Sequence, residues 1–208
     1  MMRTVKTTTL IFLVMTTAIS LHAQWEIGGV INFNIAGIHV RPVPSSESYS
    51  SRLGFGIGVV ANRELTDRID LHAEPMYLQK GARLQDDSEV IIFKLNYFEI
   101  PFMITYSFKL DSPLVPYAML GPSIGFLSGA KYRFSDGWEQ DETEDTGFFD
   151  FGAGFGGGVE YLLDQVRLFA ETRYVVGFVN VNKEAGESTV KNRGLQVLFG
   201  VTIPVGND

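Results

Sequence analysis

Ionisable residues recur at every second position in several apolar stretches of this 208-residue chain. One stretch carries Asp70, His72 and Glu74, and another carries Glu171 and Arg173. Alternate side chains of a β-strand point to the same face, so each of these sets shares one face. Carboxylates and basic groups on a shared face could relay protons or conduct cations. They could instead pair into a structural network of salt bridges.

The charged faces of the predicted strands are expected to meet inside one enclosed interior. An isolated buried charge costs several kcal/mol, so such groups must pair or be neutralised. We therefore expect a salt-bridged structural network that includes a few protonated acids, with a cation path or proton relay as the alternative. The expected members of this network are Glu26, Asp70, His72, Glu74, Glu99, Asp150, Glu160, Arg167, Glu171 and Arg173.

A hairpin near the C-terminal end of the chain suggests how these charges pair. A very short turn centred on Leu163-Asp164 would join two alternating strands. Glycines opposite long side chains would leave room for them. The expected cross-strand pairs are Glu160 with Arg167, Gly156 with Glu171, and Gly154 with Arg173.

The elements that position these residues are eight alternating stretches, linked in turn by long polar loops and short turns. The segments 25–35, 53–62 and 195–203 show the alternation over their full length. Outer-membrane barrels have short periplasmic turns, longer external loops and an apolar outer face. The pattern predicts an all-β fold, an eight-stranded antiparallel up-and-down transmembrane β-barrel. A soluble barrel or sandwich is the competing interpretation, and glycine-rich faces with paired charges argue against it.

The N-terminal residues have the pattern of a targeting segment. Arg3 and Lys6 precede an apolar run at 10–15, and residues 21–23 form a plausible cleavage site. We expect a signal peptide over 1–23 and one outer-membrane β-barrel domain over 24–208. The chain has no cysteine, which excludes disulfides and a lipid-anchored cysteine, and its net charge of −7 argues against a nucleic-acid partner.

Three other patterns could indicate chemistry, and each is weak. His39 could meet Ser45, Ser46, Asp86 and Asp87 at the barrel mouth as the site of a membrane enzyme, but their spacing imposes no geometry. The acidic run 141–145 lacks the ligand order of a calcium loop. The glycine-rich segment 152–158 lies inside a strand, so it is not a phosphate loop. We expect no catalytic residue, cofactor or metal.

Proline-containing motifs carry a resemblance to a known family. The segments Glu74-Pro75-Met76-Tyr77-Leu78-Gln79-Lys80-Gly81, 95–102 and 116–122 resemble the PorT-like outer-membrane β-barrel family. The resemblance spans most of residues 25–203 and implies a barrel of about eight strands, mostly without an assigned function. The member that gives the family its name is linked to protein secretion across the outer membrane. Pro75, Pro101, Pro116 and Pro122 fall within predicted strands, where local bulges or strand ends must accommodate them.

Together these features predict a small outer-membrane barrel whose polar interior is plugged. Such a protein would serve as a structural or interaction protein of the envelope, acting through four extracellular loops. Its expected partners are outer-membrane lipid and an envelope or secretion-complex protein. A narrow ion-conducting pore is the main alternative, and a loop-sited membrane enzyme is the third.

Overall fold

The computed structural model describes residues 25–42, 48–85, 90–183 and 188–205. Within these ranges no helix has the length and apolar character that a membrane-spanning helix needs. The regular elements are strands: β1 (Trp25–Arg41), β2 (Ser48–Ser50), β3 (Arg52–Thr66), β4 (Ile69–Ala73), β5 (Met76–Gln85), β6 (Val90–Ser107), β7 (Leu114–Arg133), β8 (Glu139–Asp141), β9 (Phe149–Leu162), β10 (Arg167–Gly177) and β11 (Thr189–Val205).

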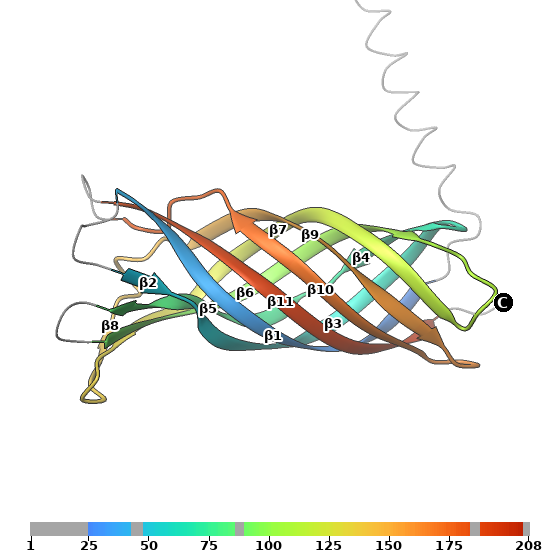
Figure 1. Ribbon diagram of the computed structural model, residues 1–208, viewed down its shortest axis with the longest axis horizontal. Coiled ribbons are helices and arrows are strands. Elements are labelled where there is room, and N and C mark those ends of the chain that lie inside the picture. The colour runs from blue at the N-terminus through green and yellow to red at the C-terminus, as the bar shows by residue number, and fades with distance from the viewer. Residues whose placement is uncertain (1–24, 43–47, 86–89, 184–187, 206–208) are drawn as a thin grey trace, which may run out of the picture.

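The strands close into an antiparallel ring (Figure 1). Strand β1 pairs with both β3 and β11, and β6 pairs with both β5 and β7, so the ring is complete. Strands β4 and β5 follow one another at a single position between β3 and β6, and β2 and β8 are short additions at one end. The ring therefore contains eight strands, each beside its neighbours in sequence. This confirms the predicted up-and-down barrel.

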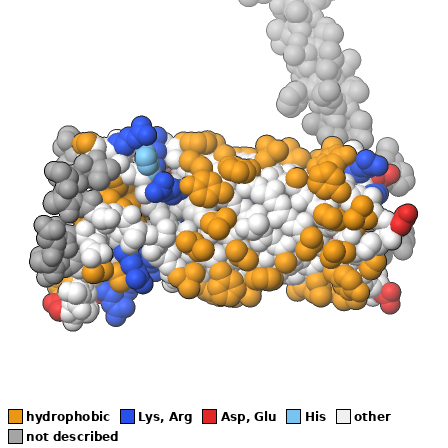
Figure 2. Space-filling model, viewed as in Figure 1, with side chains coloured by type: hydrophobic (Ala, Val, Ile, Leu, Met, Phe, Trp, Pro, Cys, Tyr) orange, Lys and Arg blue, Asp and Glu red, His pale blue; other side chains and the backbone are white. Residues whose placement is uncertain are grey.

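The two faces of each strand meet different surroundings. Phe102, Ile104 and Phe155 lie on the outside with 38%, 52% and 59% of their surface exposed, whereas Glu99 and Arg173 are buried inside. Figure 2 shows apolar side chains forming a broad band across the visible face of the barrel. An apolar surface of this extent suits contact with lipid rather than water. The orientation predicted from the alternation is confirmed.

Several strands continue well beyond the apolar band at the end that carries the long loops. Strand β7 has 20 residues, whereas a tilted strand needs roughly 9–11 to cross a bilayer. The sequence predicts a long polar loop after this strand, but β7 runs on to Arg133 and β8 pairs back against it. The prediction was wrong here because both faces of this hairpin lie outside the membrane. Without an apolar face, the period of two disappears from the sequence.

Three of the four prolines named above lie where a hydrogen-bond ladder is interrupted, whereas Pro116 pairs with Val159 within the β7–β9 ladder. Pro75 lies in the break between β4 and β5. Pro101 pairs with Ser123, and the β6–β7 ladder skips the next positions, which include Pro122. The backbone N–H of Glu74 still donates to the carbonyl oxygen of Pro101 at 3.2 Å. The missing donors of Pro75, Pro101 and Pro122 therefore fall at local breaks, and neighbouring backbone groups bridge the gap at Pro101.

Candidate functional site

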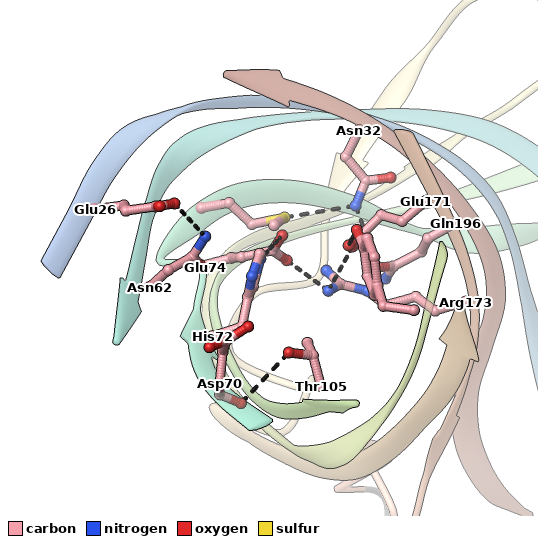
Figure 3. Close-up of polar contacts among 12 residues, drawn as sticks. Glu26, Asn32, Asn62, Asp70, His72, Glu74, Thr105, Glu171, Arg173 and Gln196 are labelled. Carbon is pink, nitrogen blue, oxygen red and sulfur yellow. Dashed lines mark hydrogen bonds and ion pairs between the residues drawn. The ribbon is translucent and has the colours of Figure 1, made fainter. Parts of the chain in front are cut away.

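The centre of the barrel holds a buried guanidinium group. Arg173 of β10 lies 2.5 Å from a carboxylate oxygen of Glu74 and 3.2 Å from one of Glu171. Its Nε donates to the side-chain oxygen of Gln196 at 2.8 Å. Figure 3 shows these side chains converging from strands on opposite sides of the ring. One cation thus joins β10, β11 and the β4–β5 junction across the lumen.

Two further groups complete this central cluster. The Nε2 atom of His72 lies 2.8 Å from Glu74, and the hydroxyl of Tyr117 donates to Glu171 at 2.9 Å. All of these side chains are buried. Each carboxylate therefore has a charged or hydrogen-bonding partner from another strand, as a charge in a low-dielectric interior requires.

Within the described part of the chain, one group of side chains has the arrangement of a metal site, and it belongs to this cluster. His72, Glu74 and Glu171 each offer a ligand atom within 4.8 Å of the others. The guanidinium of Arg173 contacts both carboxylates, so a positive charge already occupies the position that a metal ion would need. The donor set therefore fits a salt-bridge cluster better than a metal centre.

A second charged cluster lies nearer the short-turn end. Arg167 lies 2.8 Å from Glu26 of β1 and 2.8 Å from Glu160 of β9. The hydroxyl of Thr202 donates to Glu26 at 3.0 Å. Asp70, which is half-buried, accepts a hydrogen bond from a threonine through its backbone carbonyl rather than its carboxylate. The cluster links the first and last strands of the ring and thereby supports its closure.

The third cluster lies toward the long-loop end and centres on Lys80 of β5. Its ammonium group contacts Glu99 and lies 3.1 Å from Asp150. Ser123 donates to Glu99 at 2.8 Å, and the Lys80 ammonium stands 4.9 Å from the centre of the Tyr97 ring. The sequence interpretation omitted Lys80. It lies on the same alternate positions as Glu74, so extending that parity through the proline break would have found it.

The register of the β9–β10 hairpin differs from the predicted one. Arg167 pairs with Leu162 and Arg173 pairs with Gly156, because the turn closes one residue later than expected. A register shift of two residues keeps every side chain on its own face. The predicted inward or outward direction of each side chain was therefore right, whereas the predicted cross-strand pairs were wrong. Arg167 still reaches Glu160, diagonally rather than directly.

Little space remains among these clusters. Beside Lys80 and Asp150 the lumen contains a cavity of about 10 Å³, which is close to the least that one water molecule needs. Eight strands enclose an interior that side chains can fill. At the level of the apolar band, the barrel is therefore a packed core of paired charges and apolar side chains rather than an open channel.

The external mouth is different, because it contains a cavity of about 280 Å³. Apolar side chains of β1, β5, β6 and β11 form its wall, and Glu142 and Asp145 lie on one side. Sequence reasoning missed this cavity, since residues far apart in the chain build it. Its lining residues are Ile38, Val40, Tyr49, Leu84, Phe93, Leu95, Tyr132, Glu142, Asp145, Thr146, Val181, Asn182, Ser188 and Val190.

The weaker sequence candidates do not assemble into a site within the described ranges. His39 points away from the barrel, and Ser45, Ser46, Asp86 and Asp87 lie outside the described residues, as does the predicted signal peptide. In the acidic run, the Asp141 carboxylate accepts the backbone N–H of Thr143 at 2.9 Å. This bond lowers the pKa of Asp141. The glycines of 152–158 lie within β9, as expected.

A family model described as "Outer membrane protein beta-barrel domain" matches residues 18–183. Among solved structures, neisserial surface protein A (NspA) is similar, with 21% identity and a TM-score of 0.55 over 88% of this chain and 99% of that one. At this identity the likeness shows the shared barrel fold.

Two further outer-membrane structures align over most of the chain. OprG of Pseudomonas aeruginosa has 11% identity and a TM-score of 0.49, covering 89% of this chain and 97% of that one. Ail of Yersinia pestis has 11% identity and a TM-score of 0.46, covering 86% and 98%. No curated protein sequence matches the chain.

Proposed function

Because this chain belongs to the family of outer membrane protein beta-barrel domains, we propose that it is a sealed barrel that acts as an interaction protein of the envelope. The protein is located in the outer membrane. The proposed partner is a protein of the envelope or of a secretion complex. The barrel then anchors the protein in the membrane, and its external end is the surface that binds a partner.

The observation that carries this proposal is the contrast along the barrel axis. Three charge clusters, packed with apolar side chains, fill the lumen at membrane level, and a cavity of about 280 Å³ opens at the external mouth. We infer that the clusters are structural, since their carboxylates contact basic groups of the protein itself. A sealed lumen with an open mouth suits binding rather than passage.

The chemistry of the mouth indicates the kind of partner. Its wall is mainly apolar, which favours an inserted aliphatic or aromatic side chain. Glu142 and Asp145 on one side favour a basic residue next to that side chain. A protein segment with an apolar anchor flanked by Lys or Arg matches both features.

Site-specific photo-crosslinking in intact cells tests the proposal. A photoreactive residue at Leu84, inside the mouth, should give one discrete protein adduct. The same residue at Leu120, on the lipid-facing surface, should not give that adduct. Filling the cavity with Val190→Trp should abolish the Leu84 adduct, whereas Val201→Trp on the outer face should leave it unchanged. An adduct that survives Val190→Trp, or no adduct at Leu84, would refute the proposed binding role.

We further propose that residues 1–23 are removed as a signal peptide during export. The support is the basic start, the apolar run and the small residues before the expected cleavage point. The mass of the protein purified from outer membranes should correspond to a chain that starts at Gln24. A mass that retains the first residues would show an uncleaved anchor instead.

A further inference from the structure

The outer surface at the external ends of β1 and β11 carries a group of basic side chains. His39 pairs with Lys191, Gly37 with Arg193 and Arg41 with Thr189. The four basic residues His39, Arg41, Lys191 and Arg193, here called the rim patch, share the outward parity of the lipid-facing side chains. Figure 2 shows basic side chains at the edge of the apolar band, with histidine among them.

The height of the rim patch matches the level of lipid headgroups. Ile35 and Leu195 pair across β1 and β11 and are exposed on the outer face. Arg193 is the next outward residue on β11, which places it about 7 Å further along the strand. Hydrocarbon contact thus ends where the basic side chains begin.

The rim patch stands out against the charge of the whole chain. The protein has a net charge of −7, yet residues 36–41 and 189–194 contain no aspartate or glutamate. Among the described residues, no carboxylate forms an ion pair with any of the four basic groups. With respect to these described residues, the charge of the rim patch is therefore available to a group outside the protein.

A second basic cluster on the same rim provides a comparison. Lys94, Lys131 and Arg133 all surround Glu139, at 2.6, 3.5 and 3.7 Å. The protein supplies the counter-charge there. At the rim patch none of the described residues supplies one, although the two clusters lie at the same end of the barrel.

We propose that the rim patch binds the phosphate groups of a phosphorylated lipid in the leaflet around the external end. Arginine matches phosphate with paired hydrogen bonds, and lysine adds a point charge at the same level. Basic residues just beyond an apolar segment attract anionic headgroups. This site lies on the outside of the barrel and goes beyond the proposed role of the mouth.

Native mass spectrometry of the folded barrel in detergent, with diphosphoryl lipid A as the probe, tests this proposal. The wild-type protein should retain the lipid. The variant Arg41→Gln/Lys191→Gln/Arg193→Gln should bind it about 100-fold more weakly. The matched variant Lys94→Gln/Lys131→Gln/Arg133→Gln should stay within a fewfold of wild type, because its cations already face Glu139. Lipid A without phosphates should bind weakly to every form.

The folded state of each variant is checked by its mobility on a gel before and after boiling. Should the triple variant not fold, Arg193→Gln alone should still reduce retention several-fold, and Arg193→Lys should restore part of it. Millimolar inorganic phosphate should not displace the lipid, since a free ion lacks the anchoring acyl chains. Equal retention by the wild type and a folded rim-patch variant, equal binding of the dephosphorylated lipid, or displacement by inorganic phosphate would overturn the proposal.

Discussion

The interior of this barrel differs between the level of the membrane and the external mouth. At membrane level the interior holds paired charges packed among apolar side chains, with Arg173 and Lys80 each contacting two carboxylates. At the mouth the inward side chains are mainly apolar, and they enclose a cavity of about 280 Å³. The same ring of strands thus supports two kinds of interior.

The difference follows from the surroundings of each level. Inside the membrane, water is not available to satisfy a polar group, so each charge needs a partner from another strand. Those contacts fix the relative positions of β1, β5, β9 and β10. At the mouth, water and loop residues are present, so a cavity is tolerated and can accept a partner. The first level therefore holds the structure, and the second is free to bind.

Removing the central cation should have the largest effect on stability. Arg173→Met would leave Glu74 and Glu171 buried without their cation, which should destabilise the fold by about 3–5 kcal/mol. Urea unfolding in lipid vesicles measures the loss. Arg83→Met, at an exposed position of β5 outside the rim patch, is the control and should change stability by less than about 0.5 kcal/mol. Equal stability of the two variants would show that the central cluster is not structural.

The cluster near the long-loop end should show strong coupling between its members. Lys80→Met should destabilise by about 3 kcal/mol, because Glu99 and Asp150 lose their cation. A double-mutant cycle with Glu99→Gln should give a coupling free energy of about 1–3 kcal/mol. Additive effects of the two substitutions would mean that the contact has no energetic role.

Substitutions that enlarge a side chain should have different effects on stability at the mouth and at membrane level. Val190→Trp at the mouth should change stability by less than about 1 kcal/mol, since the cavity accepts the larger ring. Leu198→Trp, a fully buried position at membrane level on the same strand, should cost about 1–3 kcal/mol or prevent folding. Heat-dependent gel mobility compares the two variants. The same loss for both would contradict the contrast in packing.

The smallest expected effect is the pH dependence of the external β7–β8 hairpin. Hydrogen bonding by Lys94 lowers the pKa of Glu139, and the backbone N–H of Thr143 lowers that of Asp141. A carboxyl group with a lowered pKa stabilises the hairpin when the pH is above the group's ordinary pKa. This contribution is lost as the pH falls below about 4. The fluorescence of Trp138, whose ring lies 5.2 Å from that of Phe134, reports on the hairpin.

This titration is measured in a Trp25→Phe background, so that Trp138 is the reporting residue. The variant Glu139→Gln/Asp141→Asn should lose the acid transition of the fluorescence. A transition that persists unchanged in this variant would assign it to other groups.

The sequence predicted correctly which side chains of each strand point inward, but not which residues pair across neighbouring strands. Glu99 and Phe102 lie on opposite faces because side-chain direction depends only on parity, which the alternation reveals directly. The partner of Arg173 depends on where the β9–β10 turn closes, and a shift of two residues leaves the parity unchanged. Periodicity therefore cannot distinguish the two registers.

Two parts of the candidate site could not be predicted for a different reason. Lys80 follows a break in the strand at Pro75. Its inward direction becomes evident only when the alternation of inward and outward side chains is continued past that proline. The mouth cavity combines side chains from both ends of the chain, such as Ile38 and Val190. Its formation depends on ring closure and on strand lengths beyond the membrane, which leave no periodic signal.

Single-channel recording in planar bilayers tests most directly whether the charge clusters seal the lumen. The purified barrel should insert and carry no steady current, and Glu99→Gln should not change that. A steady, ohmic current from the wild-type protein that disappears in Glu99→Gln would show an ion pathway through the cluster of Lys80, Glu99 and Asp150. That result would replace the sealed barrel with a narrow pore.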